Sequence, residues 1–265
     1  MNIVVLIKEV PDMERVRFDR ERGVVDRASA GAEINPFDLH ALQAAVDLKE
    51  RHGARVTAVS MGPERCAASL RDAWARGADA CVCVTDRRFG GADTLATSRA
   101  LAAAISRMDC DLVLCGEKTV DGDTAQVGAE VAELLGIPHS YYVERITEID
   151  SAHVCLTTSD ICGSRQTRRM KLPALVSVAR RVAEPKLPSL KRKLDSLGIN
   201  IEKLGADELG VCEKDAGAKG SPTRVSKIVV QKSAQRKGRI FRDDLGGFAE
   251  GFIDAAKPFI GKKTE

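Results

Sequence analysis

The chain alternates between short apolar runs and longer segments in which apolar residues recur every three or four positions. The first run, within residues 2–7, is continuous, as expected for a strand that is covered on both faces of a parallel sheet. Pro36 and Pro63 stand where the first turn of a helix tolerates proline. The predicted strands are residues 2–7, 55–60, 80–84 and 111–115, and the predicted helices are residues 36–51, 63–76, 93–107 and 124–135. This alternation predicts an α/β fold with a right-handed, doubly wound parallel sheet.

From about residue 139 the pattern becomes rich in short strands. Residues 141–149, 154–158 and 175–178 are predicted strands that extend the sheet or add an antiparallel edge. Residues 213–238 look extended, and a late apolar cluster lies within residues 241–260. Because only 4% of the chain is aromatic, we expect this cluster to pack on a partner subunit. A helix that folds back on its own domain is the alternative.

Composition narrows the class of protein. The 265 residues are 44% hydrophobic and 30% charged with a net charge of +3, which indicates a globular protein and does not point to nucleic acid. No apolar run approaches the roughly 20 residues that span a bilayer, and the first residues do not read as a signal peptide, so we expect a cytoplasmic protein with no membrane span. Eight cysteines occur without a Cys-x-x-Cys pair, so no metal site is predicted and most are expected to be buried thiols. Cys81 and Cys83 alternate in a predicted strand and should share one sheet face.

The loop at residues 121–128 reads Asp-Gly-Asp-Thr-Ala-Gln-Val-Gly and lies between a predicted strand and a predicted helix. Such a loop presents free backbone N–H groups to an anion, so we interpret it as a phosphate cradle. Asp121 and Asp123 would repel a phosphate if they pointed into the cradle, so we expect them to cap the helix, brace the loop or bind a ribose or base. An ordinary strand-to-helix turn is the alternative.

Other loops are expected at the same edge of the sheet, because ligands of doubly wound sheets bind beyond the carboxyl ends of the strands. They are residues 8–11, 61–62, 89–93 and 116–127. Thr94 and Thr97 lie three apart at a helix start and are predicted to face a cofactor. In the alternative, Asp93 is only an N-cap and the threonines lie on the surface.

Sequence motifs of self-contained catalysts are missing. The four histidines lack metal-ligand spacing, and there is no Gly-x-Ser-x-Gly elbow, Walker loop or Gly-x-Gly-x-x-Gly after the first strand. The chain therefore reads as a nucleotide holder, and no catalytic residue is assigned.

Six stretches carry a resemblance in their order and spacing: residues 3–12, 34–38, 60–63, 89–98, 116–128 and 171–174. Together they resemble the β subunit of electron-transfer flavoproteins, and the similarity runs from Met1 to about Asp244. The resemblance implies a doubly wound, Rossmann-like, adenine-nucleotide-binding domain and a C-terminal arm that embraces the α subunit.

The resemblance also implies a cofactor, which differs between two types of the family. In single-flavin members the β subunit holds AMP, whereas in bifurcating and nitrogen-fixation-type members it holds a second FAD that accepts hydride from NADH. Residues 91–98, 121–128 and 220–223 are similar to the two-FAD type. We therefore expect FAD, with AMP as the alternative, NADH as the electron donor, and NADH oxidation only in the αβ complex.

The resemblance assigns site residues by position. Around the adenosine it places Leu6, Lys8, Asn35, Pro36, Phe37, Asp38 and Met61. Against the ribose and phosphates it places Gly116, Asp121, Gly122, Asp123, Thr124, Ala125, Gln126, Val127 and Gly128, acting through backbone N–H groups and the side chains of Thr124 and Gln126. Near the flavin ring or ribityl chain it places Thr94 and Thr97, beside Asp93, with Gly90 and Gly91 leaving room for nicotinamide.

Partners and domains follow from the same resemblance. The expected partners are an α subunit, an acyl-CoA-type or other dehydrogenase anchored at Leu190, and ferredoxin or flavodoxin. The expected domains are residues 1–182 for the nucleotide, 183–212 for dehydrogenase recognition and linkage, and 213–265 for the arm. Arg165, Arg168 and Arg169 depart from the family, which usually has acidic and glycine residues there. Outside the family, the alternative is an adenine-nucleotide-binding regulatory module.

Overall fold

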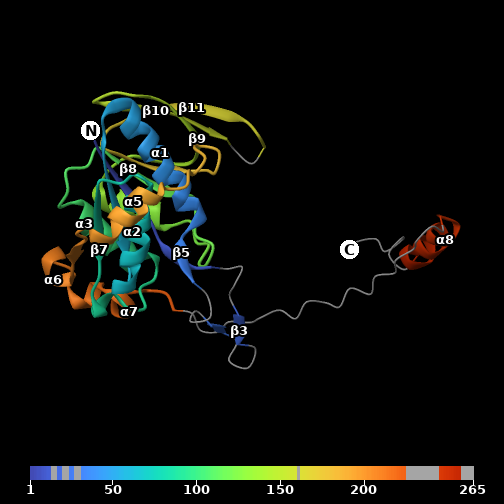
Figure 1. The fold of residues 1–265 in the computed structure, drawn as a ribbon. Helices are drawn as coiled ribbons and strands as arrows, with labels where there is room; N and C mark the ends of the chain where they lie inside the picture. Colours follow the sequence, from blue (N-terminus) through green and yellow to red (C-terminus); the bar gives the residue numbers. More distant parts are fainter. Residues whose placement is uncertain (13–16, 20–23, 27–30, 160–161, 225–244, 258–265) are drawn as a thin grey trace. The chain divides into compact units, whose positions relative to one another are not determined.

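The computed structural model describes residues 1–12, 17–19, 24–26, 31–159, 162–224 and 245–257 (Figure 1). Contacts within the chain divide it into two compact units, residues 1–228 and 229–265. Within the described residues, no helix is long and apolar enough to cross a membrane.

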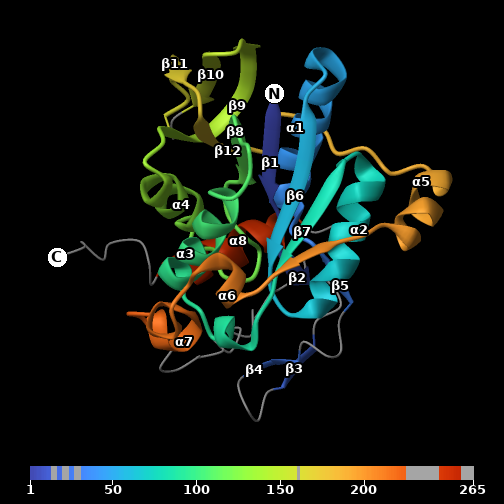
Figure 2. The same ribbon diagram turned by 90° about the vertical axis from the view of Figure 1, so that its left-hand side faces the viewer.

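The first unit is built on a nine-stranded, mostly parallel sheet (Figure 2). The strand order is β11-β10-β9-β12-β8-β1-β6-β7-β13, and only β10 and β11 run antiparallel to their neighbours. The strands of this sheet are β1 (Asn2–Leu6), β6 (Arg55–Met61), β7 (Ala80–Val84), β8 (Leu112–Gly116), β9 (His139–Ile149), β10 (His153–Ser159), β11 (Arg165–Lys171), β12 (Ala174–Val178) and β13 (Glu202–Leu204). Two small antiparallel ribbons pair β2 (Glu9–Pro11) with β5 (Ala32–Ile34) and β3 (Arg17–Asp19) with β4 (Val24–Asp26).

Helices cover both faces of the sheet (Figure 2). One core cluster joins Ile3 and Val5 to α1 and α2, and the other joins Val4 and Leu6 to α3 and α4. Alternate residues of β1 therefore point into opposite layers, which explains why its sequence is continuously apolar. The α-helices are α1 (Pro36–His52), α2 (Ala67–Arg76), α3 (Thr94–Ile105), α4 (Val127–Leu135), α5 (Leu190–Asp195), α6 (Ala206–Leu209), α7 (Gly217–Gly220) and α8 (Leu245–Ala256). Single 3₁₀ turns are η1 (Glu64–Cys66), η2 (Arg87–Phe89), η3 (Ser196–Gly198) and η4 (Glu213–Asp215).

The predicted α/β class, its parallel strands and the antiparallel edge are confirmed. Cys81 and Cys83 lie in the same core cluster, and Cys83 Sγ is 3.0 Å from the buried Cys66 Sγ. The strand order reverses at β1, which pairs with β6 on one side and with β8 on the other. A crevice for a ligand is expected at the carboxyl end of such a switch point.

Strand β11 was not predicted. Four of its seven residues are cationic, and only Met170 is buried, so its apolar pattern is too weak to indicate a strand. It forms because all seven residues pair with β10. Tyr142 has a φ of 54°, and the pairing of β9 with β12 shifts register next to it, so the strand bends where it leaves the parallel part of the sheet.

The tail differs from its prediction. Residues 213–224 are not extended, because η4 and α7 lie within them; residues 225–238 lie outside the described residues. By contacts within the chain, the first unit continues to Ile228, and β13 pairs in parallel with β7 at the sheet edge. The late apolar cluster is helical over α8, whereas Phe241, Phe259 and Ile260 lie outside the described residues.

Candidate functional site

Four loops follow the carboxyl ends of the central strands. They begin after β1 at Ile7, after β6 at Gly62, after β7 at Thr85 and after β8 at Glu117. These strands are neighbours in the parallel part of the sheet, so their carboxyl ends lie at one edge. The loops predicted from the sequence are therefore brought together, and we call this region the carboxyl edge.

Asp38 joins the ends of β1 and β8 across the switch point. Its carboxylate accepts hydrogen bonds from Lys8 N at 2.8 Å and from Gly116 N at 3.1 Å. The side chain is buried in the first turn of α1, and this burial raises the pKa of Asp38 to about 7, although the bonds to the carboxylate oppose the shift. Asp38 thus fixes the spacing of the two strands from which the site loops depart.

Asn35 holds the loop after β8 in place. Its buried side-chain amide donates to Lys118 O at 2.8 Å and accepts from Val120 N at 3.2 Å, while its own N–H donates to Lys8 O at 2.8 Å. Asn35 therefore ties the loop after β1 to the loop after β8. Both of its side-chain polar atoms are satisfied, which makes the bridge specific to an amide.

The first turn of α1 approaches the end of β8 very closely. A Cβ at Gly116 would lie 2.5 Å from Asp38 Oδ1 and 2.7 Å from the carbonyl carbon of Phe37. Phe37 is buried and lies under the guanidinium of Arg180, 4.5 Å from its ring centroid, with Lys118 Nζ at 5.7 Å. Only glycine fits this contact of strand and helix.

Two ion pairs brace the loop after β8. Lys8 Nζ lies 2.7 and 2.8 Å from the two carboxylate oxygens of Asp121, and Lys118 Nζ lies 3.0 Å from Asp123. Burial opposes ionisation of Asp121, but bonds from Lys8 and Gly122 N outweigh it and hold its pKa below the usual range. Both carboxylates are thus paired with lysines, and of the three roles expected for Asp121, these contacts show the bracing of the loop.

Residues 124–128 form a row of unused backbone donors. In the described part of the chain, none of these five consecutive N–H groups has a hydrogen-bond acceptor. Asp123 and Ala125 have φ values of 51° and 54°, a region that residues other than glycine seldom adopt. Alternation of left-handed and right-handed backbone turns successive N–H groups toward one side, which is the geometry of an anion-binding nest. The N-terminus of α4 adds a favourable dipole.

The left-handed residues also explain where α4 begins. The predicted helix started at Thr124, whereas α4 starts at Val127, because the positive φ of Ala125 does not fit a right-handed helix. Gly122, the glycine of this loop next to Asp123, does not have a positive φ. Gly128 is the crowded glycine of the loop, since a Cβ would lie 2.6 Å from Tyr141 Oη.

Tyr141 and Glu130 hold the start of α4, and the sequence analysis missed both. Tyr141 Oη accepts from Ala129 N at 2.8 Å. Glu130 Oε1 accepts from Thr94 Oγ1 at 3.0 Å, and Glu130 Oε2 lies 2.8 Å from Ser98 Oγ. Thr94 Oγ1 is also 3.3 Å from Gln126 Oε1, so the start of α3 is joined to the row of donors. The one signal that the sequence offered for this contact is an acidic residue, Glu130, in the first turn of α4.

The other predicted residues lie at or near this edge. Asp93 caps α3 by accepting from Ala96 N at 3.0 Å, and Pro36 occupies the first turn of α1. Gly91 has a φ of 72° in the loop before α3, next to Gly90, and Thr97 is partly exposed on α3. Leu6 is buried in the core beneath the edge, Met61 ends β6, and Thr124 is exposed.

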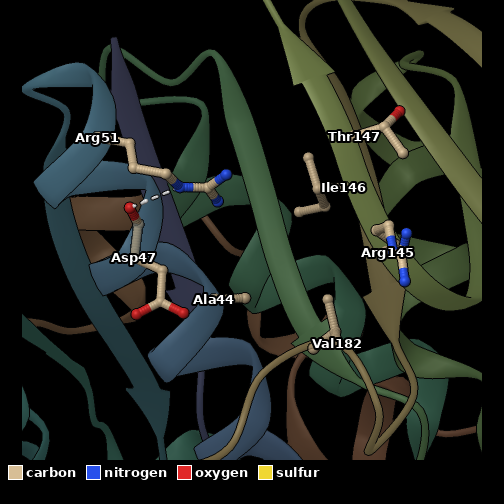
Figure 3. Close-up of a pocket in the computed structure, with 7 residues that line it drawn as sticks. All are labelled: Ala44, Asp47, Arg51, Arg145, Ile146, Thr147 and Val182. Atoms are coloured by element: carbon tan, nitrogen blue, oxygen red, sulfur yellow. Dashed lines mark hydrogen bonds between the residues drawn. The ribbon is translucent and has the colours of Figure 1, made fainter.

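A separate hollow of about 440 Å³ lies between α1 and β9 (Figure 3). It is lined by Ala44, Asp47 and Arg51 of α1, by Arg145, Ile146 and Thr147 of β9, and by Val182. Arg51 Nε donates to the backbone oxygen of Asp47 at 3.2 Å. The hollow borders the C-terminal half of α1, whereas the site loops contact its first turn, so it is not part of the carboxyl edge.

The fold and this edge define the class: a mostly parallel α/β protein with an amide-lined loop at its switch point. The electron transfer flavoprotein domain matches residues 22–209. The chain is 41% identical over 227 residues to the electron transfer flavoprotein subunit beta of Clostridium acetobutylicum, with 86% of this chain and 87% of the relative covered. It is 36% identical over 244 residues to Protein FixA of Sinorhizobium fredii, with 89% and 86% covered.

The chain therefore belongs to the electron transfer flavoprotein β-subunit family, which includes proteins of the FixA type. A further relative, the subunit beta of Megasphaera elsdenii, is 36% identical over 236 residues, with 86% of this chain and 87% of the relative covered. The family serves electron transfer, involves a flavin or nucleotide in general, and pairs β subunits with α subunits.

Proposed function

We propose that this chain is the β subunit of a heterodimeric, two-flavin electron transfer flavoprotein, with FAD held at the carboxyl edge. The observation that carries the proposal is the row of five free N–H groups at residues 124–128, at the switch point of the sheet and the start of α4. When bound, the flavin supplies the redox chemistry, accepting hydride from NADH and passing electrons to a dehydrogenase and to ferredoxin or flavodoxin.

The residues present fit a dinucleotide. The row of amides provides donors for phosphate oxygens, while Lys8 and Lys118 lie beside it and neutralise the loop's own carboxylates. Thr124 and Gln126 add side-chain groups at the same row. Thr94 of α3 contacts Gln126, and we assign Thr94, Thr97 and the Gly90–Gly91 loop to the rest of the dinucleotide. AMP, the alternative, would place its single phosphate at the amides and would not reach the threonines of α3.

Replacing Thr124 with valine should lower nucleotide affinity about tenfold to a hundredfold. The change removes a hydroxyl that we assign to a phosphate oxygen, at a cost of roughly 1.5 to 3 kcal/mol for a charge-assisted bond. Calorimetric titration of the full chain with FAD and, separately, with AMP measures the loss and shows which nucleotide binds more tightly.

The matched control is Thr147→Val, because Thr147 is an exposed threonine on β9 outside the carboxyl edge. It should bind as the unmodified chain does. Equal affinity of the Thr124→Val variant would remove Thr124 from the site, and no binding of either nucleotide by the unmodified chain would contradict the proposed function.

Two exposed apolar surfaces support the proposed protein partners. On α8 of the second unit, the rings of Phe248 and Phe252 stack at 5.9 Å, and both side chains are exposed together with Ile253. We assign this face to the α subunit, since exposed clustered aromatic residues are typical of interfaces. In and beside α5, the exposed large residues are Leu187, Leu190, Leu194 and Leu197. We assign this second surface to the dehydrogenase, with Leu190 as the anchor.

Replacing Leu190 with alanine should raise the KM for an acyl-CoA dehydrogenase about tenfold and leave kcat unchanged. Leu190 is 74% exposed in the free chain, so the loss corresponds to the apolar area that it would bury in the complex. Steady-state electron transfer by the αβ complex measures both constants. Leu134→Ala, an exposed leucine on α4, is the control; an unchanged KM for the Leu190 variant would move the docking surface elsewhere.

A further inference from the structure

Asp93 makes more bonds than a helix cap requires. One carboxylate oxygen, Oδ1, caps α3 through Ala96 N. The other, Oδ2, accepts from both Thr223 N at 3.0 Å and Thr223 Oγ1 at 2.8 Å, and Asp93 N donates to Ser221 Oγ at 2.8 Å. These bonds outweigh the effect of burial and hold the pKa of Asp93 below its usual range. A single aspartate thus fastens a segment that is about 130 residues away in the chain.

The rest of that segment, residues 217–223, packs on the loop before α3. Ala218 N donates to Gly90 O at 2.9 Å, and Ser221 Oγ donates to Gly217 O at 2.7 Å. Gly217 has a φ of 52°, and a Cβ there would lie 2.1 Å from Arg88 O, so two backbones meet where no side chain fits. We call residues 217–223 the strap.

A continuous path connects the strap to the amide row. Thr94 follows Asp93 directly, and its hydroxyl contacts both Gln126 and Glu130 at the start of α4. Gln126 belongs to the amide row, and Glu130 is fixed by the same α3 helix through Ser98. Any rearrangement of residues 124–128 therefore acts on the α3 terminus that Asp93 ties to the strap.

We propose that Asp93 couples occupancy of the amide row to the strap, and thereby to the part of the chain that leaves the first unit. This inference rests on the proposed nucleotide at residues 124–128. A nucleotide that fixes Gln126 and Glu130 also fixes Thr94 and Asp93, so the strap is released less often when the site is filled. Because coupling is reciprocal, a strap that is held in place also favours nucleotide binding.

Hydrogen exchange of the full chain with and without FAD tests the coupling. In the unmodified chain, FAD should slow amide exchange in residues 116–128 and, by about fivefold or more, in residues 217–223. In Asp93→Asn, the side-chain oxygen still caps α3, but the amide nitrogen that replaces Oδ2 cannot accept from Thr223. FAD should bind this variant more weakly, but at a saturating concentration it should still protect residues 116–128 and leave residues 217–223 unprotected.

Two further variants make the result decisive. Thr223→Val removes one of the two donors to Asp93 and should lose part of the protection of the strap. Asp207→Asn is the control, because Asp207 pairs with Arg88 near the strap but lies outside the path. Two results would overturn the coupling alone. In the first, FAD protects residues 116–128 of the unmodified chain but not residues 217–223. In the second, FAD fully protects the strap in Asp93→Asn. If FAD protects neither residues 116–128 nor residues 217–223, the proposed function is wrong.

Discussion

Replacing Gly116 with alanine is expected to destabilise the first unit by about 3 kcal/mol or more and to abolish nucleotide binding. The added Cβ would lie 2.5 Å from Asp38 Oδ1 and 2.7 Å from the carbonyl carbon of Phe37. Neither atom can yield cheaply, because one belongs to the backbone of α1 and the other belongs to a buried carboxylate whose two oxygens accept from Lys8 N and Gly116 N. Overpacking of this kind typically costs about 1 to 3 kcal/mol and more where backbone must move.

Urea unfolding and FAD titration measure the two effects of the Gly116 change. The matched control is Gly122→Ala in the loop after β8, where a Cβ would meet its nearest atom, Thr119 Oγ1, at 3.5 Å, an ordinary contact. This control should unfold within about 0.5 kcal/mol of the unmodified chain. An equal effect of the two variants would contradict the close contact between β8 and α1.

Asp38 is expected to contribute to the free energy of unfolding by an amount that falls as the pH rises. Its pKa is about 7 in the folded chain, against 3.8 when the residue is exposed. Between these values the folded chain keeps a proton that the unfolded chain releases, so stability is greatest at low pH, declines through pH 7 and is constant above it. A shift of this size corresponds to roughly 2.5 kcal/mol between pH 5 and pH 7.5.

Asp38→Asn removes this titration. Urea unfolding at pH 5, 6, 7 and 7.5 should show a difference between the unmodified chain and the variant that changes by about 2.5 kcal/mol over the range. Asp47→Asn, on the same helix and partly exposed, should follow the unmodified chain at every pH. A pH-independent difference for Asp38→Asn would mean that its carboxyl group is ionised throughout.

The central strands were predicted well because strands that are buried on both faces appear in the sequence as continuous apolar runs. Strands β1 and β8 are covered on both faces, so nearly every residue is apolar and the runs stand out. Strand β11 escaped prediction because it is stabilised by pairing with β10, while its side chains are mostly exposed and cationic. Backbone hydrogen bonds to a neighbouring strand do not require particular side chains, so the composition of an edge strand need not identify it as a strand.

The site was predictable as a set of loops, but its contacts were not. Strand ends at a switch point must lie together, which is why residues near Lys8, Gly116 and Asp121 were expected at one edge. The sequence does not show that Lys8 pairs with Asp121, 113 positions away, since several carboxylates are expected at the same edge of the sheet. It also does not show that the backbone takes a positive φ at Asp123 and Ala125, because residues other than glycine seldom adopt this conformation.

The nucleotide content of the αβ complex tests the central claim most directly. The complex of this chain with its α subunit is purified without added nucleotide and denatured in acid, and the released nucleotides are separated and quantified. We expect two FAD for each heterodimer, one of them held by this chain at residues 116–128. One FAD with one AMP, or one FAD with no second nucleotide, would contradict it.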